Sequence, residues 1–148
     1  EWSEERELDW NLLADPKHKK IQDWMKALLK LYRKNKCMYE LDTSWEGFEW
    51  INADDNQRSI FSFVRKSKDG KNNLLFVINF TPVARDDYRV GVPKRKTYNL
   101  VLNSEAAQFN NTDVERPEKY KAEKVECDGR KFSFAYPLAP YGVAVFKF

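Results

Sequence analysis

The sequence predicts a mainly β protein, in which an antiparallel β-sandwich follows one amphipathic α-helix. Three observations support this fold class. Two apolar runs flank a polar turn between residues 60 and 80, further strand-like segments recur at regular intervals, and residues 16–35 repeat with helical spacing. A length of 148 residues suffices for one domain with a substantial core and a small additional piece.

The central predicted element is a hairpin whose strands are Ile60–Val64 and Leu74–Phe80, with Asp69-Gly70 in the turn. Its second strand is apolar at both parities: one face carries Leu74, Phe76, Ile78 and Phe80, and the other carries Leu75 and Val77. A strand of this kind must be covered on both sides, so we expect it in the middle of a sheet with two buried faces. Pro82, which lacks a backbone donor, ends it.

One amphipathic helix is predicted over residues 16–35. Asp15 occupies the N-cap position and Pro16 the first helical position. Apolar residues then recur every three or four positions, at Ile21, Trp24, Met25, Leu28, Leu31 and Tyr32, while lysine and arginine fill the opposite face. The acidic segment before the helix, residues 1–15, is predicted to be a loop with one short helical turn.

The remaining strand signals are Phe48–Asn52, Tyr88–Val92, Thr97–Asn103, a weaker Tyr120–Cys127, Lys131–Leu138 and Val143–Phe148. In the third of these, Tyr98, Leu100 and Leu102 are predicted to point inward, and Asn99 and Asn103 outward. Residues 104–118 are polar without a period, which indicates a surface loop, and Cys127–Arg130 has a hairpin turn sequence. Short strands in this number predict a sandwich with Greek-key or meander connections.

Charge and hydropathy exclude several classes of partner. The 26 basic and 23 acidic residues give a net charge of only +3 and are interspersed, so we expect no nucleic-acid partner. No run approaches the roughly 20 apolar residues that span a bilayer, so no membrane partner is expected. The chain begins at Glu1 without an initiator methionine, which we interpret as removal of a leader or excision from a longer protein.

The two cysteines, Cys37 and Cys127, pair only if the fold brings them together. We interpret them as reduced thiols of a cytoplasmic protein. Together with a single histidine they give no metal-ligand spacing, and no glycine-rich loop is present to hold phosphate, so no metal or cofactor is expected.

Catalytic constellations are few. His18 is the only histidine and has lysine neighbours, which favours a solvated surface residue over a general base. The acidic pairs Asp54-Asp55 and Asp86-Asp87 are predicted to lie in turns between strands. Adjacent residues in a turn point apart, so these pairs are interpreted as turn formers and not as an acid/base pair.

The aromatic residues are more informative than the acids. Five tryptophans are many for this length, and Trp2, Trp10, Trp45 and Trp50 lie outside the clear strand periods. Exposed aromatic rings stack on the apolar faces of sugars, whereas buried ones seal the junctions between elements. Packing is the favoured interpretation for Trp45 and Trp50. For Trp2 and Trp10, which lie near Asp9 in the acidic segment, the two alternatives stay open.

Several segments together resemble one known family. In order along the chain they are Glu1-Trp2, Leu8-Asp9-Trp10, Leu31-Tyr32-Arg33, Tyr39-Glu40-Leu41-Asp42, Gly47-Phe48-Glu49-Trp50-Ile51, Phe63-Val64-Arg65, Asn79-Phe80-Thr81-Pro82-Val83, Asp87-Tyr88-Arg89-Val90-Gly91, Leu102-Asn103-Ser104 and Leu138-Ala139-Pro140-Tyr141-Gly142-Val143-Ala144-Val145. The whole chain is similar to the C-terminal region of bacterial 1,4-α-glucan (glycogen) branching enzymes of the α-amylase superfamily, glycoside hydrolase family 13. It departs from that pattern at residues 110–119, where the loop is shorter and has less glycine.

The resemblance implies a domain organisation. Residues 1–40 are expected to be the terminal loop and last helix of a (β/α)8 catalytic barrel, and residues 41–148 the C-terminal β-sandwich domain of the α-amylase type. The family's aspartate nucleophile and glutamate acid/base act as a retaining pair and belong to a part of the barrel upstream of Glu1. Branching enzymes transfer α-1,4-glucan chains to 6-hydroxyls in glycogen biosynthesis, and this chain alone is expected to be inactive.

The candidate substrate-binding residues are Trp2, Asp9, Trp10 and Trp45. The first three match a segment after the last barrel strand, where they would line the rim of an active site. The implied partners are an α-glucan, reached through the parent enzyme, and the missing barrel. Without the barrel, part of the Trp24/Leu28/Leu31 stripe is expected to be exposed. We expect this to cause either weak self-association through helix 16–35 or a repositioned N-terminal segment. The alternatives are a free-standing carbohydrate-binding sandwich and a protein-interaction module.

Overall fold

The computed structural model describes residues 3–5, 7–110 and 115–148. Trp2, one of the candidate substrate-binding residues, lies outside the described residues. In chain order the elements are η1 (Trp10–Ala14), α1 (Pro16–Lys34), η2 (Lys36–Met38), η3 (Trp45–Gly47), β1 (Phe48–Asp55), β2 (Ile60–Arg65), β3 (Leu74–Asn79), β4 (Arg85–Val92), β5 (Thr97–Asn103), β6 (Lys119–Lys121), β7 (Phe132–Leu138) and β8 (Val143–Lys147).

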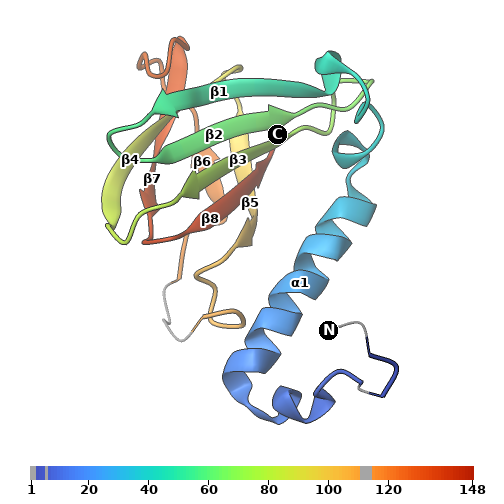
Figure 1. Cartoon of the computed structure of the whole chain (residues 1–148). Helices are drawn as coiled ribbons and strands as arrows, with labels where there is room; N and C mark the ends of the chain where they lie inside the picture. Colours follow the sequence, from blue (N-terminus) through green and yellow to red (C-terminus); the bar gives the residue numbers. More distant parts are fainter. Residues whose placement is uncertain (1–2, 6, 111–114) are drawn as a thin grey trace.

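The strands form two antiparallel sheets packed face to face, which confirms the predicted class (Figure 1). The larger sheet has six strands in the order β1-β2-β3-β8-β5-β6, and the smaller one pairs β4 with β7. Strands β1 to β3 form a meander, after which the chain crosses repeatedly between the sheets. The C-terminal strand β8 is inserted between β3 and β5, so the end of the chain completes the middle of the larger sheet.

Strand β3 is buried on both faces, as its apolar pattern predicted. Leu75 and Val77 belong to the inner cluster, the core between the two sheets. Leu74 and Phe76 belong to the outer cluster, which lies on the opposite face of the six-stranded sheet beneath α1. The turn after β2 has Gly70 at φ 65°, a left-handed conformation that glycine adopts without steric cost.

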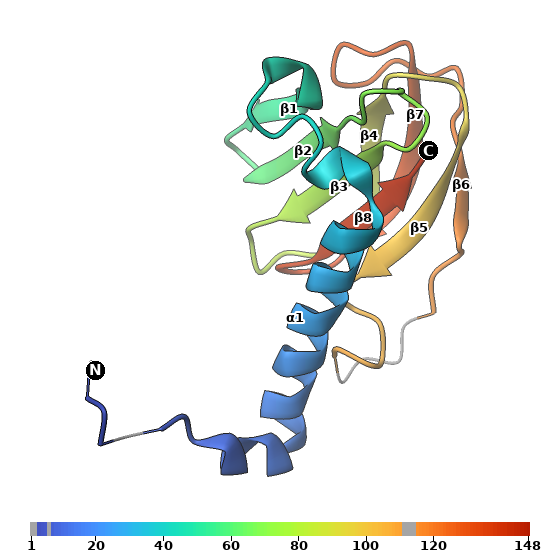
Figure 2. The same cartoon turned by 90° about the vertical axis from the view of Figure 1, so that its right-hand side faces the viewer.

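Helix α1 begins as its capping sequence predicts. The Asp15 carboxylate accepts a hydrogen bond from the backbone N–H of Lys17 at 2.8 Å, and Pro16 occupies the first turn. The C-terminal half of the helix lies across the outer face of the larger sheet near β3 and β8 (Figure 2). There Leu31 is buried, and Trp24 meets the ring of Phe109 edge-on with 5.1 Å between the centroids.

The predicted exposure of the Trp24/Leu28/Leu31 stripe is wrong, because these residues pack into or against the outer cluster. A different side of α1 is exposed, which we call the open helix face; it consists of Ile21, Met25, Leu29 and Tyr32. Two apolar faces therefore lie on one helix, and the sequence pattern merged them into a single stripe because both repeat at three- and four-residue intervals.

A one-residue bulge in β5 overturns part of its predicted alternation. Leu100 pairs with Phe146 and Leu102 pairs with Val145, so Val101 has no partner on β8. The extra residue inverts the alternation of sides. Leu102 consequently joins the outer cluster instead of the inner one, and Asn103, predicted to face outward, is buried.

The remaining local predictions divide into confirmed and corrected ones. The turn at residues 127–130 is a two-residue hairpin with Asp128 and Gly129 both at positive φ. The weak strand signal at 120–127 is reduced to the three residues of β6, followed by isolated bridges. The acidic pairs do not lie in turns: residues 54 and 55 end β1, and residues 86 and 87 fall within β4 at an irregular register.

Candidate functional site

A polar groove of about 370 Å³ lies at one end of the sandwich, where η3 meets the turns after β2 and β4. This volume is at the small end of the range for ligand pockets. Apolar residues and the C-terminal Phe148 line part of it, and charged residues line the rest. The complete lining is Leu41, Glu46, Glu49, Val64, Lys66, Ser67, Lys68, Asp69, Gly70, Asn73, Pro93, Lys94 and Phe148.

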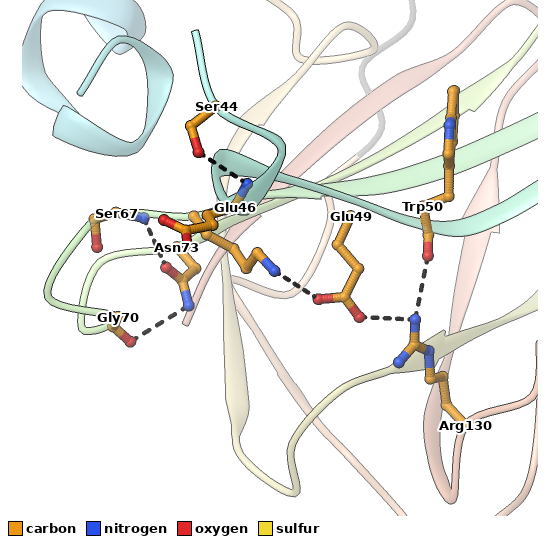
Figure 3. Close-up of polar contacts among 9 residues, drawn as sticks. Ser44, Glu46, Glu49, Trp50, Ser67, Gly70, Asn73 and Arg130 are labelled. Carbon is orange, nitrogen blue, oxygen red and sulfur yellow. Dashed lines mark hydrogen bonds and ion pairs between the residues drawn. The ribbon is translucent and has the colours of Figure 1, made fainter. Parts of the chain in front are cut away.

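Short-range hydrogen bonds fix the walls of the groove (Figure 3). On one side, the Ser44 hydroxyl accepts a hydrogen bond from the backbone N–H of Glu46 at 3.2 Å and caps η3. On the other side, the Asn73 amide closes the turn after β2: it accepts from the Ser67 N–H at 3.1 Å and donates to the Gly70 carbonyl at 3.4 Å. Both walls are therefore formed in the free protein.

Gly47, at the end of η3, is required by close packing. A Cβ atom at this position would lie 2.4 Å from the backbone oxygen of Leu41. This contact holds the short helix against the connector that precedes it, so η3 and its side chains are placed on a fixed support.

Ion pairs cross the groove floor and the adjoining strand. The Glu49 carboxylate accepts from Lys66 Nζ at 3.2 Å and from Arg130 Nη2 at 2.7 Å. Arg130 also donates to the Trp50 carbonyl at 3.2 Å (Figure 3). The groove side chains of Glu46, Lys68 and Lys94, by contrast, make no hydrogen bond or ion pair within the described part of the chain.

The predicted site residues fall at two ends of the molecule. Trp45 lies in η3 beside the groove and is 93% exposed, so the favoured packing interpretation is wrong for this residue. Trp10, 60% exposed, begins η1, and Asp9 precedes it at the far end of α1 (Figure 1). A helix of 19 residues separates the two places by roughly 28 Å, so the structure does not bring these residues together.

Trp50 combines packing and exposure. Its ring contacts those of Phe48 and Phe63, with centroids 4.9 and 5.8 Å apart, yet it remains 49% exposed. It belongs to an aromatic row on the outer side of the larger sheet, carried by β1, β2 and the residue after β3, that consists of Phe48, Trp50, Phe61, Phe63 and Phe80. Phe63 also stacks on Phe76, so the row adjoins the outer cluster that α1 covers.

His18, weighed above as a general base, is exposed on α1, as its charged surroundings predicted. Within the described residues no three histidine, cysteine, aspartate or glutamate side chains converge as a metal site. No helix in residues 3–5, 7–110 and 115–148 has the length and apolar composition needed to cross a bilayer.

Both cysteines are free. Cys37 is buried in the outer cluster, and burial raises the pKa of its thiol. Burial and the neighbouring Asp128 carboxylate raise the pKa of Cys127 to about 11. Both groups are therefore protonated near neutral pH and are poor nucleophiles.

Comparison with known proteins identifies the fold family. A family model described as "Alpha amylase, C-terminal all-beta domain" matches residues 50–148. The chain belongs to this family. The match covers β1 from its third residue through to the end of β8, and so includes both sheets of the α-amylase C-terminal domain.

Relatives extend the similarity to residues before the family match. A 1,4-alpha-glucan branching enzyme of Butyrivibrio fibrisolvens is 46% identical over all 148 residues. The corresponding enzyme of Aquifex aeolicus is 43% identical over 99% of the chain, and that of Cereibacter sphaeroides is 41% identical over 95%. The chain spans 23% of the length of the first two relatives and 19% of the third.

The groove was missed by the sequence analysis, which identified only Trp45 near it. Its charged residues come from η3, β1, the turn after β2 and the turn after β4. No spacing in the sequence links these segments. The exposed tryptophan was the one available signal.

Proposed function

We propose that this chain is the non-catalytic C-terminal part of a 1,4-α-glucan branching enzyme, whose parent transfers α-1,4-glucan chains to 6-hydroxyls during glycogen biosynthesis. The observation that carries the proposal is the 46% identity over the whole chain to a branching enzyme of which it spans only 23%.

In this proposal residues 1–40 complete a catalytic barrel and residues 41–148 form the supporting sandwich. The open helix face supports this division, since Ile21, Met25 and Leu29 are 68%, 54% and 55% exposed on a helix that is already packed on its other side. Exposed apolar residues gathered on one face mark an interaction surface. We assign the open helix face and the aromatic row to contact with the rest of the enzyme.

An activity assay tests the first part. The purified chain is incubated with amylose, and branching is followed by the fall in iodine absorbance. We expect no change from the chain alone, and full branching from a chimera in which it replaces the matching region of the Butyrivibrio fibrisolvens enzyme. Branching by the chain alone, or a folded but inactive chimera, would contradict the proposal.

The docking surface is tested by Met25→Glu, with Lys26→Glu as the matched control on the neighbouring exposed position. In the chimera, Met25→Glu is expected to lower the thermal midpoint because it places a charge in an apolar contact, whereas Lys26→Glu is not. In the isolated chain, sedimentation velocity should detect weak self-association that Met25→Glu abolishes. Equal behaviour of the two variants in both experiments would remove the surface assignment.

We further propose that Asp9 and Trp10, with Trp2, contribute to the glucan-binding rim of the parent's active site. The high exposure of Trp10 in a segment that also carries the Asp9 carboxylate supports this role. In the chimera, Trp10→Ala should raise the KM for amylose, and Leu12→Ala, an exposed residue of the same segment, should leave it unchanged. An unchanged KM in Trp10→Ala would exclude the rim assignment.

A further inference from the structure

Trp45 is the most exposed of the large hydrophobic residues that the structure describes. Its side chain is 93% exposed, and no ring contact involves it among the described residues, whereas Trp50 and Phe80 both contact neighbouring rings. A single exposed apolar residue is common on protein surfaces and is not by itself a site. Trp45 is a candidate because it lies in η3 directly before Glu46, and Glu46 lines the polar groove.

The charge of the groove indicates the class of ligand. Three carboxylates, Glu46, Glu49 and Asp69, are matched by three ammonium groups, Lys66, Lys68 and Lys94. A balanced set of this kind attracts neither an anion nor a cation strongly, but it offers many acceptors and donors to hydroxyl groups. The groove between α1 and β5 differs, since its lining contains three lysines, Lys30, Lys34 and Lys147, and no carboxylate.

Some charged side chains of the groove are held by hydrogen bonds within the protein, and others can form hydrogen bonds to a ligand. Glu49 is held between Lys66 and Arg130, and the Asp69 carboxylate accepts from the Ser67 hydroxyl at 2.7 Å and from the Lys71 N–H at 2.9 Å. The carboxylate of Glu46 and the ammonium groups of Lys68 and Lys94 have no protein partner within the described residues. Held groups lose little entropy on binding, and the available ones supply new hydrogen bonds.

We propose that Trp45 and this groove form a binding subsite for glucosyl units of a neutral α-glucan chain. The indole ring stacks on the apolar face of a sugar, the Glu46 carboxylate accepts hydrogen bonds from its hydroxyls, and Lys68 and Lys94 donate to sugar oxygens. The choice of α-glucan over another neutral polyol rests on the proposed function, whereas the stacking and the charge balance rest on the geometry. The subsite anchors a chain and takes no part in bond cleavage.

The location gives this subsite a separate role from the Asp9 and Trp10 segment. The two places lie at opposite ends of α1, so one glucan chain that contacts both must extend over roughly 28 Å or more. A subsite at that distance raises the local concentration of glucan near the enzyme and does not position the reacting bond.

The test uses the full chain, which contains the groove. Affinity electrophoresis in gels containing glycogen is expected to retard the wild type, and titration with maltoheptaose should give a Kd. Trp45→Ala should weaken both by roughly tenfold or more, as expected for loss of an aromatic anchor, and Glu46→Gln by a smaller factor. Because Trp45 is almost fully exposed, we expect these variants to keep the wild-type thermal midpoint.

The matched control is Tyr141→Ala, an exposed aromatic residue in the turn between β7 and β8, at the opposite end of β8 from the groove residue Phe148, which should bind glycogen like the wild type. A loss in Tyr141→Ala without a loss in Trp45→Ala would overturn the groove assignment, as would absence of retardation in the wild type. Competition with inorganic phosphate tests the charge argument. Displacement of maltoheptaose by millimolar phosphate would show an anion site and overturn the neutral-ligand assignment.

The outcome is independent of the chimera assays. An active chimera with an isolated chain that does not bind glycogen would sustain the proposed function and remove the subsite. A chain that binds maltoheptaose through Trp45 but gives a folded, inactive chimera would sustain a carbohydrate-binding groove and remove the branching-enzyme assignment.

Discussion

The two faces of the six-stranded sheet differ in how completely the chain covers them. The inner face is closed by β4 and β7, and Phe146 there is fully buried among the rings of Tyr120, Phe134 and Tyr136. The outer face is covered by α1 over part of its width, and Phe80 at its uncovered part is 60% exposed. The difference shows that the inner core is completed by this chain, while the outer side carries apolar surface beyond what the chain covers.

Alkaline pH should give the largest effect, because four groups associated with the inner core act in one direction. Burial raises the pKa of Tyr98 to about 12 and of Cys127 to about 11, and raises the pKa of Tyr88 and Tyr136 further. These groups are neutral when protonated. Above about pH 9, a cysteine thiol begins to ionise in the unfolded chain. The unfolded state then binds fewer protons than the folded state.

The free energy of unfolding should therefore fall as pH rises from about 9 towards 12. Urea denaturation followed by circular dichroism across this range measures the change. The near-ultraviolet absorbance of tyrosinate, recorded over the same pH range, should show that the tyrosines ionise as the protein unfolds. A free energy that stays constant over the window would show that these groups are more solvated than their burial indicates.

A pair of identical substitutions compares the faces directly. Phe146→Ala removes a ring with no exposed surface and should reduce the free energy of unfolding by about 3–5 kcal/mol. Phe80→Ala removes a largely exposed ring and should cost about 1 kcal/mol or less. Chemical denaturation with a common m-value provides both numbers. Similar costs for the two would mean that the outer face is as tightly packed as the inner one.

A substitution in the outer cluster should lower the free energy of unfolding less than one in the inner cluster, and should affect a smaller part of the structure. Leu31→Ala is expected to cost about 2 kcal/mol, since Leu31 lies at the edge of the cluster with 9% of its surface exposed. Leu29→Ala, two residues earlier on the exposed side of the same helix and 55% exposed, is the control and should change little. Hydrogen exchange should show faster exchange in α1 of Leu31→Ala with protection of β3 and β8 preserved; loss of protection throughout would mean that helix and sandwich unfold together.

The smallest expected effect comes from the helix start. Asp15→Ala removes the acceptor for the Lys17 N–H and should lower the free energy of unfolding by about 1 kcal/mol. Asp15→Asn keeps an acceptor oxygen and should retain most of the stability that the cap provides. Thermal unfolding of both variants measures the difference. An Asn variant as unstable as the Ala variant would assign the effect to charge instead of capping.

The sequence was most predictive where one segment contained its own signal. Residues 16–34 became a helix and Leu74–Asn79 a doubly buried strand because local periodicity and capping determine both. It failed where two segments had to be compared. Nothing in α1 itself says that Leu28 meets the sheet while Met25 does not, and nothing in β5 indicates the bulge at Val101.

The same difference between local signals and contacts between segments explains which residues of the candidate site could be predicted. Trp45 was identified because a tryptophan in an irregular, polar connector is conspicuous by itself. Glu46, Lys68 and Lys94 were not, because surface charges are numerous and only the fold brings these three to one groove. Burial of the inner tyrosines, and the resulting shifts in their pKa values, also depend on contacts between distant strands.

The bulge at Val101 has a consequence for how the length of β5 can vary. Because Leu100 pairs with Phe146 and Leu102 with the next residue, Val145, deletion of Val101 would leave a regular strand in which Leu102 keeps its outer position and Asn103 its place opposite Ala144. A one-residue deletion between Thr97 and Leu100 would instead move part of the strand to the wrong side of the sheet. Engineered or natural versions of this domain that are one residue shorter within β5 should therefore lack the residue at Val101, and other changes in length should fall after Asn103, in the loop.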